Sequence, residues 1–437
     1  MEQTISEILS FVNENDIKFI RLQFCDIFGD LKNISIMSSQ LEKAFKYGIS
    51  FDASSIKGFL DVKNSDLFLV PDPTTITILP WRPQEGRVAR FFCYIKTSEG
   101  EIFQGDCRNI LNKTVEELIE KDYTVKIGPE SEFYLFKTDE DAEPLLEPQD
   151  KAGYFDIAPY DKGENIRREV CLTLEEMGVE PESSHHESGP GQNEIDFKFE
   201  NPLESADNFV TLKSVVKTIA SLNGLYASFI PKPFIDKSGS GFHINLSLYK
   251  GDKNVFISTK DNKYSDEAES FIAGILYRIN ELTAILNPIV NSYRRFGTYE
   301  APKNITWSYK GRDSLIRIPA ASGNYSRMEL RSADCVCNPY LAFTLLIKAG
   351  IEGIEKKKKL SEIKYNNEDV ENIMLPDNLN DALTLLKNSI FVKEALGEFI
   401  FEKFITEKEK EWESFISKND NLDEVTSWEI SNYFYKY

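Results

Sequence analysis

KIGPESEFYLF, residues 126–136, is a strand-forming run that carries two glutamates separated by one serine. Alternate side chains of an extended strand point to opposite faces, so Glu130 and Glu132 are expected to share one face. Two carboxylates side by side on an apolar strand repel each other and lose hydration, a cost that bound cations remove. At a rise of about 3.3 Å per residue their Cα atoms lie roughly 6.6 Å apart, which suits two neighbouring metal ions. From this stretch alone, a solvated sheet face with ordinary ion pairs is an equally good interpretation.

The chain has 437 residues, enough for two or three domains, and its 41% hydrophobic and 12% aromatic content is typical of folded proteins. It carries 51 Lys and Arg against 71 Asp and Glu, a net charge of −20. Such a charge repels phosphate backbones, so we expect no direct nucleic-acid partner. A small anionic substrate can bind only where arginine or a metal ion reverses the local field.

The six cysteines are scattered, and the spacing of the closest two, Cys335 and Cys337, is not that of a zinc knuckle. We therefore expect buried free thiols in a reducing compartment. Residues 1–15 are acidic and amphipathic, and they lack the basic start and long apolar core of a signal peptide. No apolar run approaches the length that spans a bilayer, so the protein is expected in the cytoplasm with no membrane partner.

Periodicity and turn residues predict an α+β chain with a smaller N-terminal unit and a larger second unit. A hinge near residues 106–109 would separate two domains, residues 1–107 and 108–437. FDASSIKGF, residues 51–59, is expected to be a loop with a functional role. The expected strands include residues 17–24, 31–37, 67–70, 75–79, 88–95, 225–230, 241–248, 306–309, 314–318 and 326–331. The expected helices include residues 40–47, 109–120, 163–177, 201–222 and 265–286, with mostly helix after residue 338.

All three histidines lie beside Gly-rich turns or carboxylates. His185 and His186 directly precede Glu187, His243 follows SGSGF, and a further acid, Glu329, lies in RMELR. A single histidine is more often a structural residue than a ligand. Four separate segments that offer Glu or His on strands beside glycines nevertheless favour a metal site. Oxygen ligands with one histidine suit Mg²⁺ or Mn²⁺ better than zinc.

Arginines gather in the last third of the chain, at Arg295, Arg312, Arg317, Arg327 and Arg331. Guanidinium groups beside divalent cations neutralise a transferring phosphoryl group, so this combination indicates phosphate chemistry. Neither a Walker A sequence nor GxGxxG is present. A nucleotide would therefore not bind through a P-loop or a Rossmann turn.

Several segments together resemble class I glutamine synthetase, in the family's order and nearly from end to end. They are GPESEFYLF, YFDIAPYD, HHESGPGQNEIDF, PKPFIDKSGSGFHINLSL, NSYRRFGTYEAP, SLIRIP and RMELRSADCVCNPYLAF, together with FDASSIKGF and the terminal WEISNYFYKY. Any one of these motifs is weak, but this many in order is very specific. The resemblance is to the short branch without adenylylation, because Ile373 stands where the other branch carries its modified tyrosine.

This resemblance implies an N-terminal β-grasp domain followed by the large catalytic α/β domain with an antiparallel sheet. It implies an ATP-dependent ligase that makes L-glutamine from L-glutamate and ammonia through a γ-glutamyl phosphate. Two or more Mg²⁺ or Mn²⁺ ions per active site and ATP as cosubstrate belong to that expectation. So does a homo-oligomer, a dodecamer of two hexameric rings with each active site between adjacent subunits. A single ring, and a regulatory protein partner, stay open.

The resemblance also assigns roles to matching positions. The ligands of one metal would be Glu132, Glu187 and Glu194, and those of the second, nucleotide-bridging metal would be Glu130, His243 and Glu329. The glutamate-binding set would be Gly239, Arg295, Glu300, Arg312 and Arg331. Positions near ATP would be Glu182, Phe199, Asn245, Ser247, Arg317 and Arg327. The ammonium site would hold Asp52, Ser55 and Tyr154, with Asp52 reaching in from the neighbouring subunit.

Each role has a chemical reason. A γ-carboxylate is a poor electrophile, so a phosphoryl group converts it into an acyl phosphate with a good leaving group. That intermediate hydrolyses easily, and a flap closed by Glu300 would exclude water. Ammonium is not a nucleophile until a carboxylate such as Asp52 removes a proton. Arg312 and Arg317 would offset the charge on the transferring phosphoryl oxygens.

The sequence departs from the usual family pattern at three further places. The flap, residues 294–302, is one residue shorter than the commoner form and lacks its proline. Ser238 stands where many members have Asn beside the glutamate α-carboxylate, and Asp61 stands where the branch without adenylylation often has Arg. The closure geometry of the flap and feedback by glutamine are therefore open.

Two other functions compete with glutamine synthesis. A related ligase would join glutamate to a polyamine or another amine. The intact set Asp52, Ser55, Tyr154 and Glu187 favours the small ammonium cation over a larger amine. A non-catalytic, glutamine-sensing scaffold would have lost metal ligands, and the sequence has lost none.

Overall fold

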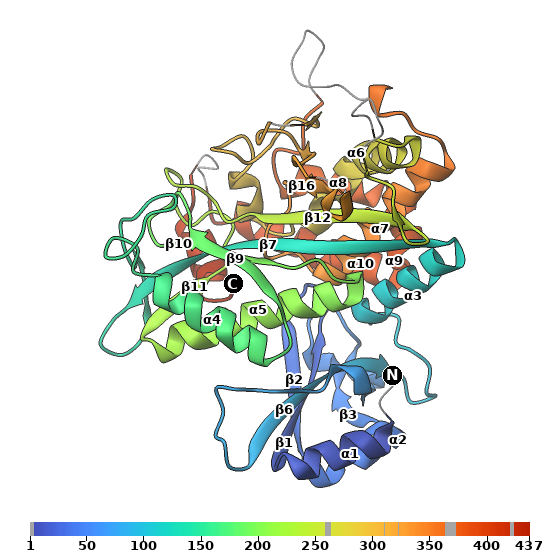
Figure 1. The fold of residues 1–437 in the computed structure, drawn as a ribbon, viewed down its shortest axis with the longest axis vertical. Coiled ribbons are helices and arrows are strands. Elements are labelled where there is room, and N and C mark those ends of the chain that lie inside the picture. Colours follow the sequence, from blue (N-terminus) through green and yellow to red (C-terminus); the bar gives the residue numbers. More distant parts are fainter. Residues whose placement is uncertain (1–3, 258–263, 310, 322, 363–372, 420–423) are drawn as a thin grey trace.

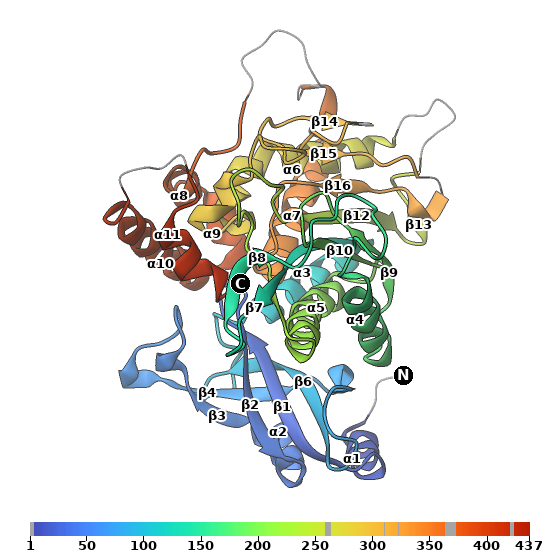
Figure 2. The same ribbon diagram turned by 90° about the vertical axis from the view of Figure 1, so that its left-hand side faces the viewer.

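The computed structural model describes residues 4–257, 264–309, 311–321, 323–362, 373–419 and 424–437. Within these residues the strands form two sheets, a smaller one near the N-terminus and a larger one in the rest of the chain (Figure 1). Figure 2 shows two helices, α4 (Glu164–Glu176) and α5 (Pro202–Leu222), lying between the two sheets. This is the α+β architecture that the sequence predicts.

The N-terminal sheet has the strand order β2-β1-β6-β4-β3, with β5 paired to β6. Its elements are α1 (Ile5–Glu14), β1 (Ile17–Cys25), β2 (Leu31–Met37), α2 (Leu41–Tyr47), β3 (Ile49–Asp52), β4 (Asp66–Pro71), β5 (Thr77–Ile78) and β6 (Arg87–Lys96). The segment expected to be a loop, residues 51–59, instead begins inside β3. A 3-10 turn, Ala53–Ser55, follows because the Asp52 carboxylate accepts a hydrogen bond from the Ser54 N–H.

The larger sheet has the order β14-β15-β16-β12-β7-β10-β9 and is antiparallel except between β14 and β15. Three short strands extend it: β8 and β11 pair with β7, and β13 pairs with β12. The strands are β7 (Tyr123–Thr138), β8 (Pro144–Pro148), β9 (Pro181–His186), β10 (Gln192–Phe197), β11 (Leu225–Ser228), β12 (Phe242–Lys250), β13 (Lys253–Asn254), β14 (Trp307–Ser308), β15 (Ile316–Arg317) and β16 (Met328–Leu330). The other helices are α3 (Cys107–Glu120), α6 (Asp266–Leu286), α7 (Pro339–Glu355), α8 (Leu379–Lys387), α9 (Ile390–Leu396), α10 (Glu398–Ile416) and α11 (Ser427–Glu429).

Strand β7 lies in the middle of this sheet because most of its side chains are apolar. Ile127, Phe133 and Leu135 are fully buried. Ser131 lies on the face opposite the glutamates, also fully buried, with its Oγ 3.3 Å from the Cys335 Sγ. All six cysteines are free; five are buried as expected, whereas Cys171 is partly exposed.

A buried arginine joins the N-terminal unit to the rest of the chain. Arg108 of α3 donates to the Asp207 carboxylate of α5 from Nε at 3.0 Å and from Nη2 at 2.8 Å. Its Nη1 donates to Asp72, which follows β4, at 2.9 Å. The Tyr340 hydroxyl of α7 donates to the same Asp207 at 2.7 Å. One guanidinium group therefore links three segments of the fold.

The segment expected to be a hinge is the first turn of α3. Asp106 caps this helix by accepting a hydrogen bond from the Asn109 N–H at 3.0 Å. We propose that the domains meet here, with residues 1–107 and 108–437 as their limits. The capped start of the helix and the Arg108 contacts support that division.

Replacement of Arg108 by methionine is expected to lower the free energy of unfolding by about 3–5 kcal/mol, because two buried carboxylates lose their partner. The matched control is Lys121→Met at the end of the same helix. Lys121 pairs with Glu355, but both side chains are at least half exposed, so the change should be below about 1 kcal/mol. Urea denaturation followed by circular dichroism measures both. Equal effects of the two variants would contradict this account of the junction.

Candidate active site

The register of the large sheet brings acids and a histidine from separate strands together. His243 of β12 lies opposite Glu130 of β7, and Glu194 of β10 lies opposite Glu132. Glu329 of β16 lies opposite Asn245 of β12. Since the side chains of neighbouring strands at one register share a face, these groups gather on one side of the sheet.

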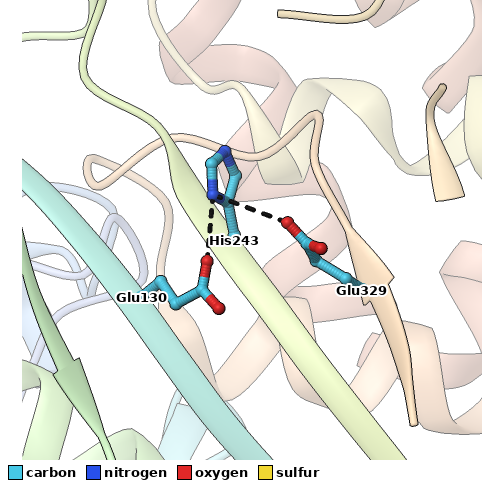
Figure 3. A group of neighbouring side chains, drawn as sticks. All are labelled: Glu130, His243 and Glu329. Carbon is cyan, nitrogen blue, oxygen red and sulfur yellow. Dashed lines mark hydrogen bonds and ion pairs between the residues drawn. The ribbon is translucent and has the colours of Figure 1, made fainter. Parts of the chain in front are cut away.

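Glu130, His243 and Glu329 form the first acidic cluster (Figure 3). The His243 Nδ1 is 3.2 Å from the Glu130 carboxylate and 3.8 Å from that of Glu329. One ligand atom from each residue lies within 4.8 Å of the others. Two carboxylates and an imidazole at this spacing can hold one hard divalent cation.

Two arginines hold the Glu329 carboxylate, which is only 1% exposed. Arg317 Nη1 donates to its Oε2 at 2.7 Å, and Arg331 Nη1 donates to its Oε1. A third arginine reaches the same cluster indirectly: Arg327 donates to the Asn245 Oδ1, and the Asn245 Nδ2 donates to Glu130, both at 2.8 Å. The arginines therefore fix the directions of the carboxylates.

His185, Glu187 and Glu194 form the second acidic cluster. One ligand atom each from His185, Glu187 and Glu194 lies within 4.8 Å of the others, and the His185 Nε2 is 2.9 Å from Glu187. Glu132 lies beside this group and accepts hydrogen bonds from the Gln192 side chain and the Gly241 N–H. These acids can hold a second cation beside the first.

Sequence reasoning missed two participants, Gln192 and Asp196. Both are on β10, two residues before and two residues after Glu194, so the alternation of a strand would have placed them on its face. Asp196 forms a further acidic group with Glu130 and Glu194. The two-residue spacing from Glu194 was visible in the sequence. Alternation gives only the direction of a side chain, however, and does not reveal its role.

The electrostatics of the two clusters differ. Burial opposes the ionised form of Glu130, but hydrogen bonds from His243 and Asn245 outweigh it and lower its pKa to about 2. Burial raises the pKa of Glu132, and burial with the nearby carboxylates of Asp196 and Glu132 raises the pKa of Glu194 well above its usual value. Uncompensated negative charge of this kind is what a divalent cation relieves.

A cavity of about 670 Å³ opens over these acids. The arginines named from the sequence line it, namely Arg295, Arg312, Arg317, Arg327 and Arg331. Gly239 also lines it, and a Cβ there would lie 2.5 Å from the Arg295 side chain, so only glycine leaves room for that arginine. The floor is therefore anionic and the wall cationic, a combination suited to a metal-bound phosphate and a carboxylate.

The flap, residues 294–302, covers one side of the cavity. Thr298, Tyr299 and Glu300 line it, and the Glu300 carboxylate lies 3.6 Å from the Arg331 guanidinium. The Glu300 side chain is 66% exposed. Tyr154 also lines the cavity, with its ring stacked on Phe155 at 4.2 Å.

Some of the residues named from the sequence do not line this cavity. Asn245 and Ser247 lie on β12 beneath it, and Ser247 donates to the Ser326 carbonyl. Other positions lie further away: Phe199 faces the Tyr325 ring, Glu182 is exposed on β9, and Asp52 and Ser55 are exposed in the N-terminal unit. Within one chain, the proton acceptor predicted for ammonium is therefore separate from the cavity.

The third histidine, His186, belongs to a structural network. It is 1% exposed, its Nε2 is 3.1 Å from Asp150, and its Nδ1 contacts the Glu187 carbonyl at 2.6 Å. Asp161 lies in the same buried group, but Arg167 pairs with it at 2.6 Å and supplies the positive charge. The group therefore holds the Glu187 backbone in place instead of binding an ion.

Two family models match nearly the whole chain. Residues 104–433 match the glutamine synthetase catalytic domain, and residues 16–98 match the glutamine synthetase beta-grasp domain. The chain belongs to the glutamine synthetase family. The resemblance read from the sequence and the expected β-grasp fold are thereby confirmed.

Relatives in the glutamine synthetase family are similar over their full lengths. The chain is 45% identical to glutamine synthetase of Clostridium saccharobutylicum, with 99% of each chain covered. It is 45% identical to that of Methanosarcina mazei (98% of this chain, 97% of the relative) and 42% identical to that of Staphylococcus aureus (99% of each). These matches confirm the predicted ATP-dependent ligase that makes glutamine, and they do not favour the alternatives.

Solved structures share the glutamine synthetase fold. A structure of GmaS in complex with ADP superposes with a TM-score of 0.86 at 27% identity, covering 98% of this chain and all of that one. Glutamine synthetase of Plasmodium falciparum has the same TM-score at 23% identity, covering 99% of each chain, and that likeness concerns the fold alone. No helix in the described part of this chain is long and apolar enough to cross a membrane.

Proposed function

We propose that the cavity over the large sheet is where this chain phosphorylates glutamate and then amidates it. The chain makes glutamine from glutamate and ammonia with ATP, as its family membership establishes. The observation that carries the assignment of the site is the meeting of Glu130, His243 and Glu329 beneath a wall of arginines. An anionic floor under a cationic wall suits phosphoryl transfer between two anions.

The reaction depends on divalent metal, and we propose Mg²⁺ or Mn²⁺, two or more per site. One ion would be held by Glu132, Glu187 and Glu194, and the other by Glu130, His243 and Glu329. The donor chemistry fits, since the ligands are five carboxylates and one imidazole, with no thiolate. When bound, such cations neutralise phosphate oxygens during the transfer.

The remaining roles belong to side chains in and around the cavity. We assign glutamate binding to Gly239, Arg295, Glu300, Arg312 and Arg331, and the nucleotide region to Glu182, Phe199, Asn245, Ser247, Arg317 and Arg327. In this assignment Arg312 and Arg317 offset the negative charge of the phosphoryl group while it is transferred to glutamate. The product of that transfer is a γ-glutamyl phosphate. Glu300 and its flap keep water from that intermediate.

Asp52 would complete the site from a second copy of the chain. Its carboxylate is exposed, and hydrogen bonds from Ser54 lower its pKa, so it is ionised and attracts ammonium. Together with Ser55, the Asp52 carboxylate would lie beside Tyr154 of an adjacent subunit. There it would take a proton from ammonium, which leaves nucleophilic ammonia. From the resemblance to the family, we propose that the chain assembles into a dodecamer of two hexameric rings. We also propose that it works in the cytoplasm, because its cysteines are free thiols.

The test is an assay of phosphate release with ATP, glutamate and either Mg²⁺ or Mn²⁺, run with ammonium and with a panel of monoamines and diamines. Ammonium is expected to give equal amounts of phosphate and glutamine. The larger amines are expected to give little, because the set Asp52, Ser55, Tyr154 and Glu187 is intact and a bulkier amine would need that pocket reshaped. Phosphate release that needs a diamine and ignores ammonium would overturn the choice of substrate.

A further inference from the structure

Lys232 is a fully buried lysine between β11 and β12, outside the lining of the cavity. Its Nζ donates to the Lys237 carbonyl and, at 3.1 Å, to the Thr298 hydroxyl. The same Nζ lies 4.7 Å from the centre of the Tyr299 ring. One ammonium group thus contacts the loop before β12 and two residues of the flap.

The backbone that carries this lysine is itself fixed. The Lys232 N–H donates to the Asn291 Oδ1 at 2.7 Å, and the Asn291 Nδ2 donates to the Lys232 carbonyl at 2.9 Å and to the buried Glu429 at 3.1 Å. These two hydrogen bonds with Asn291 hold the backbone of Lys232 in place. The side chain therefore extends from a rigid base toward the flap.

The flap side of the contact is tied to the same loop. The Thr298 hydroxyl donates to the Arg295 carbonyl at 2.7 Å, and the Tyr299 hydroxyl donates to the Asp236 carbonyl. Lys237 and Ser238 complete the loop, and Ser238 lines the cavity beside Gly239. Lys232 hence contacts two segments that line the cavity without lining it itself.

The ammonium has no carboxylate partner within 4.0 Å among the residues that the structure describes; Asp236, the nearest acid in sequence, pairs with Lys237 at 2.9 Å. Burial, with the neighbouring charge of Arg295, lowers the pKa of Lys232 to about 8. A buried cation without a counter-ion is costly, so a purely apolar side chain would fill this space more favourably. The contacts it makes with the flap are the gain that offsets this cost.

We propose that Lys232 is a positioning residue that holds the flap over the cavity while the acyl phosphate awaits ammonia. The inference rests on the proposed function of the site. When the flap is loose, water attacks the acyl carbon, the bond to the phosphate oxygen breaks, and glutamate and phosphate leave together. ATP is then consumed without formation of glutamine.

The experiment compares Lys232→Met with the unchanged protein, both as the assembled enzyme. Methionine keeps most of the apolar stem and removes the donors. Glutamine formation is expected to fall about tenfold. Phosphate release is expected to exceed glutamine formation by about threefold or more and to persist without ammonium, because the intermediate reaches water. Thr298→Val, which removes the acceptor on the flap together with the hydrogen bond from that hydroxyl to the Arg295 carbonyl, should shift the same ratio in the same direction.

Lys237→Met is the matched control, an exposed lysine in the same loop whose side chain points to Asp236. It should leave both the rate and the ratio within about twofold. If Lys232→Met lowers stability while phosphate and glutamine stay equal, the lysine is structural only and the proposal fails. If the unchanged protein makes no glutamine, the proposed function fails instead, so the two failures are distinguishable.

Discussion

Replacement of Glu329 by glutamine is expected to lower the rate of glutamine synthesis about a thousandfold, equivalent to about 4 kcal/mol of transition-state stabilisation. Glu329 is fully buried, contacts His243 and accepts from Arg317 and Arg331. The amide keeps the shape but removes the charge, so the affinity for a cation falls, and its NH₂ group replaces one of the two oxygens that accept from the arginines. Steady-state kinetics over a range of Mg²⁺ concentrations measures this loss.

Asp313→Asn is the control for Glu329→Gln. Asp313 is an exposed carboxylate next to Arg312. Its replacement by asparagine removes one negative charge from the same region and leaves the first acidic cluster unchanged. Its activity should stay within about twofold of the unchanged protein. Binding of ATP in the presence of Mg²⁺ should weaken in the Glu329 variant alone. Full activity of Glu329→Gln with unaltered dependence on Mg²⁺ would show that the first acidic cluster is not a metal site.

Replacement of Asp52 by alanine is expected to abolish glutamine synthesis while leaving binding of ATP nearly intact. A general base contributes about 10²–10⁴-fold to such a step. Asp52 is exposed, and its carboxylate hydrogen-bonds with serines of its own turn and with Ser65 before β4, so its loss should not unfold the chain. Isothermal titration with ATP and Mg²⁺, beside the synthesis assay, separates binding from chemistry.

Co-expression of the two inactive variants tests whether Asp52 acts in a neighbouring subunit. In a mixed ring, some cavities with an intact Glu329 lie beside a subunit with an intact Asp52. Random mixing in a head-to-tail ring restores about a quarter of the sites. No activity above that of either parent would contradict a site shared between subunits. The two variants expressed separately and assayed together, without exchange of subunits, provide the baseline.

The placement of the acids followed from local rules. Alternation along β7 put Glu130 and Glu132 on one face, and the structure has both lining the cavity. Which strands become neighbours of β7 depends on long-range pairing, and alternation within one segment contains no information about it. The resemblance supplied that information for His243 and Glu329. The resemblance did not point to Asp196. Strand alternation did not identify it either, because alternation gives every second residue the same direction, whatever its role.

The loops between the last strands were harder to predict. Strands expected at residues 306–309, 314–318 and 326–331 shrink to two or three residues in β14, β15 and β16. The arginines of these segments line the cavity instead of extending the strand pairing. The β-propensity of the sequence therefore overestimated the length of the strands. The short strand β8 was missed because its sequence, PLLEP, begins and ends in proline, which argues against a strand except at a sheet edge.

The first acidic cluster also has a consequence for how the chain acquires activity. Glu130, His243 and Glu329 are far apart in sequence and meet only through the pairing of β7, β12 and β16. Pairing between distant segments is slow and comes late, because the closure entropy of long loops is lost before the contacts form. A nascent or partly refolded chain therefore lacks the cation-binding centre of the first acidic cluster, and capture of a metal there marks completion of the tertiary structure.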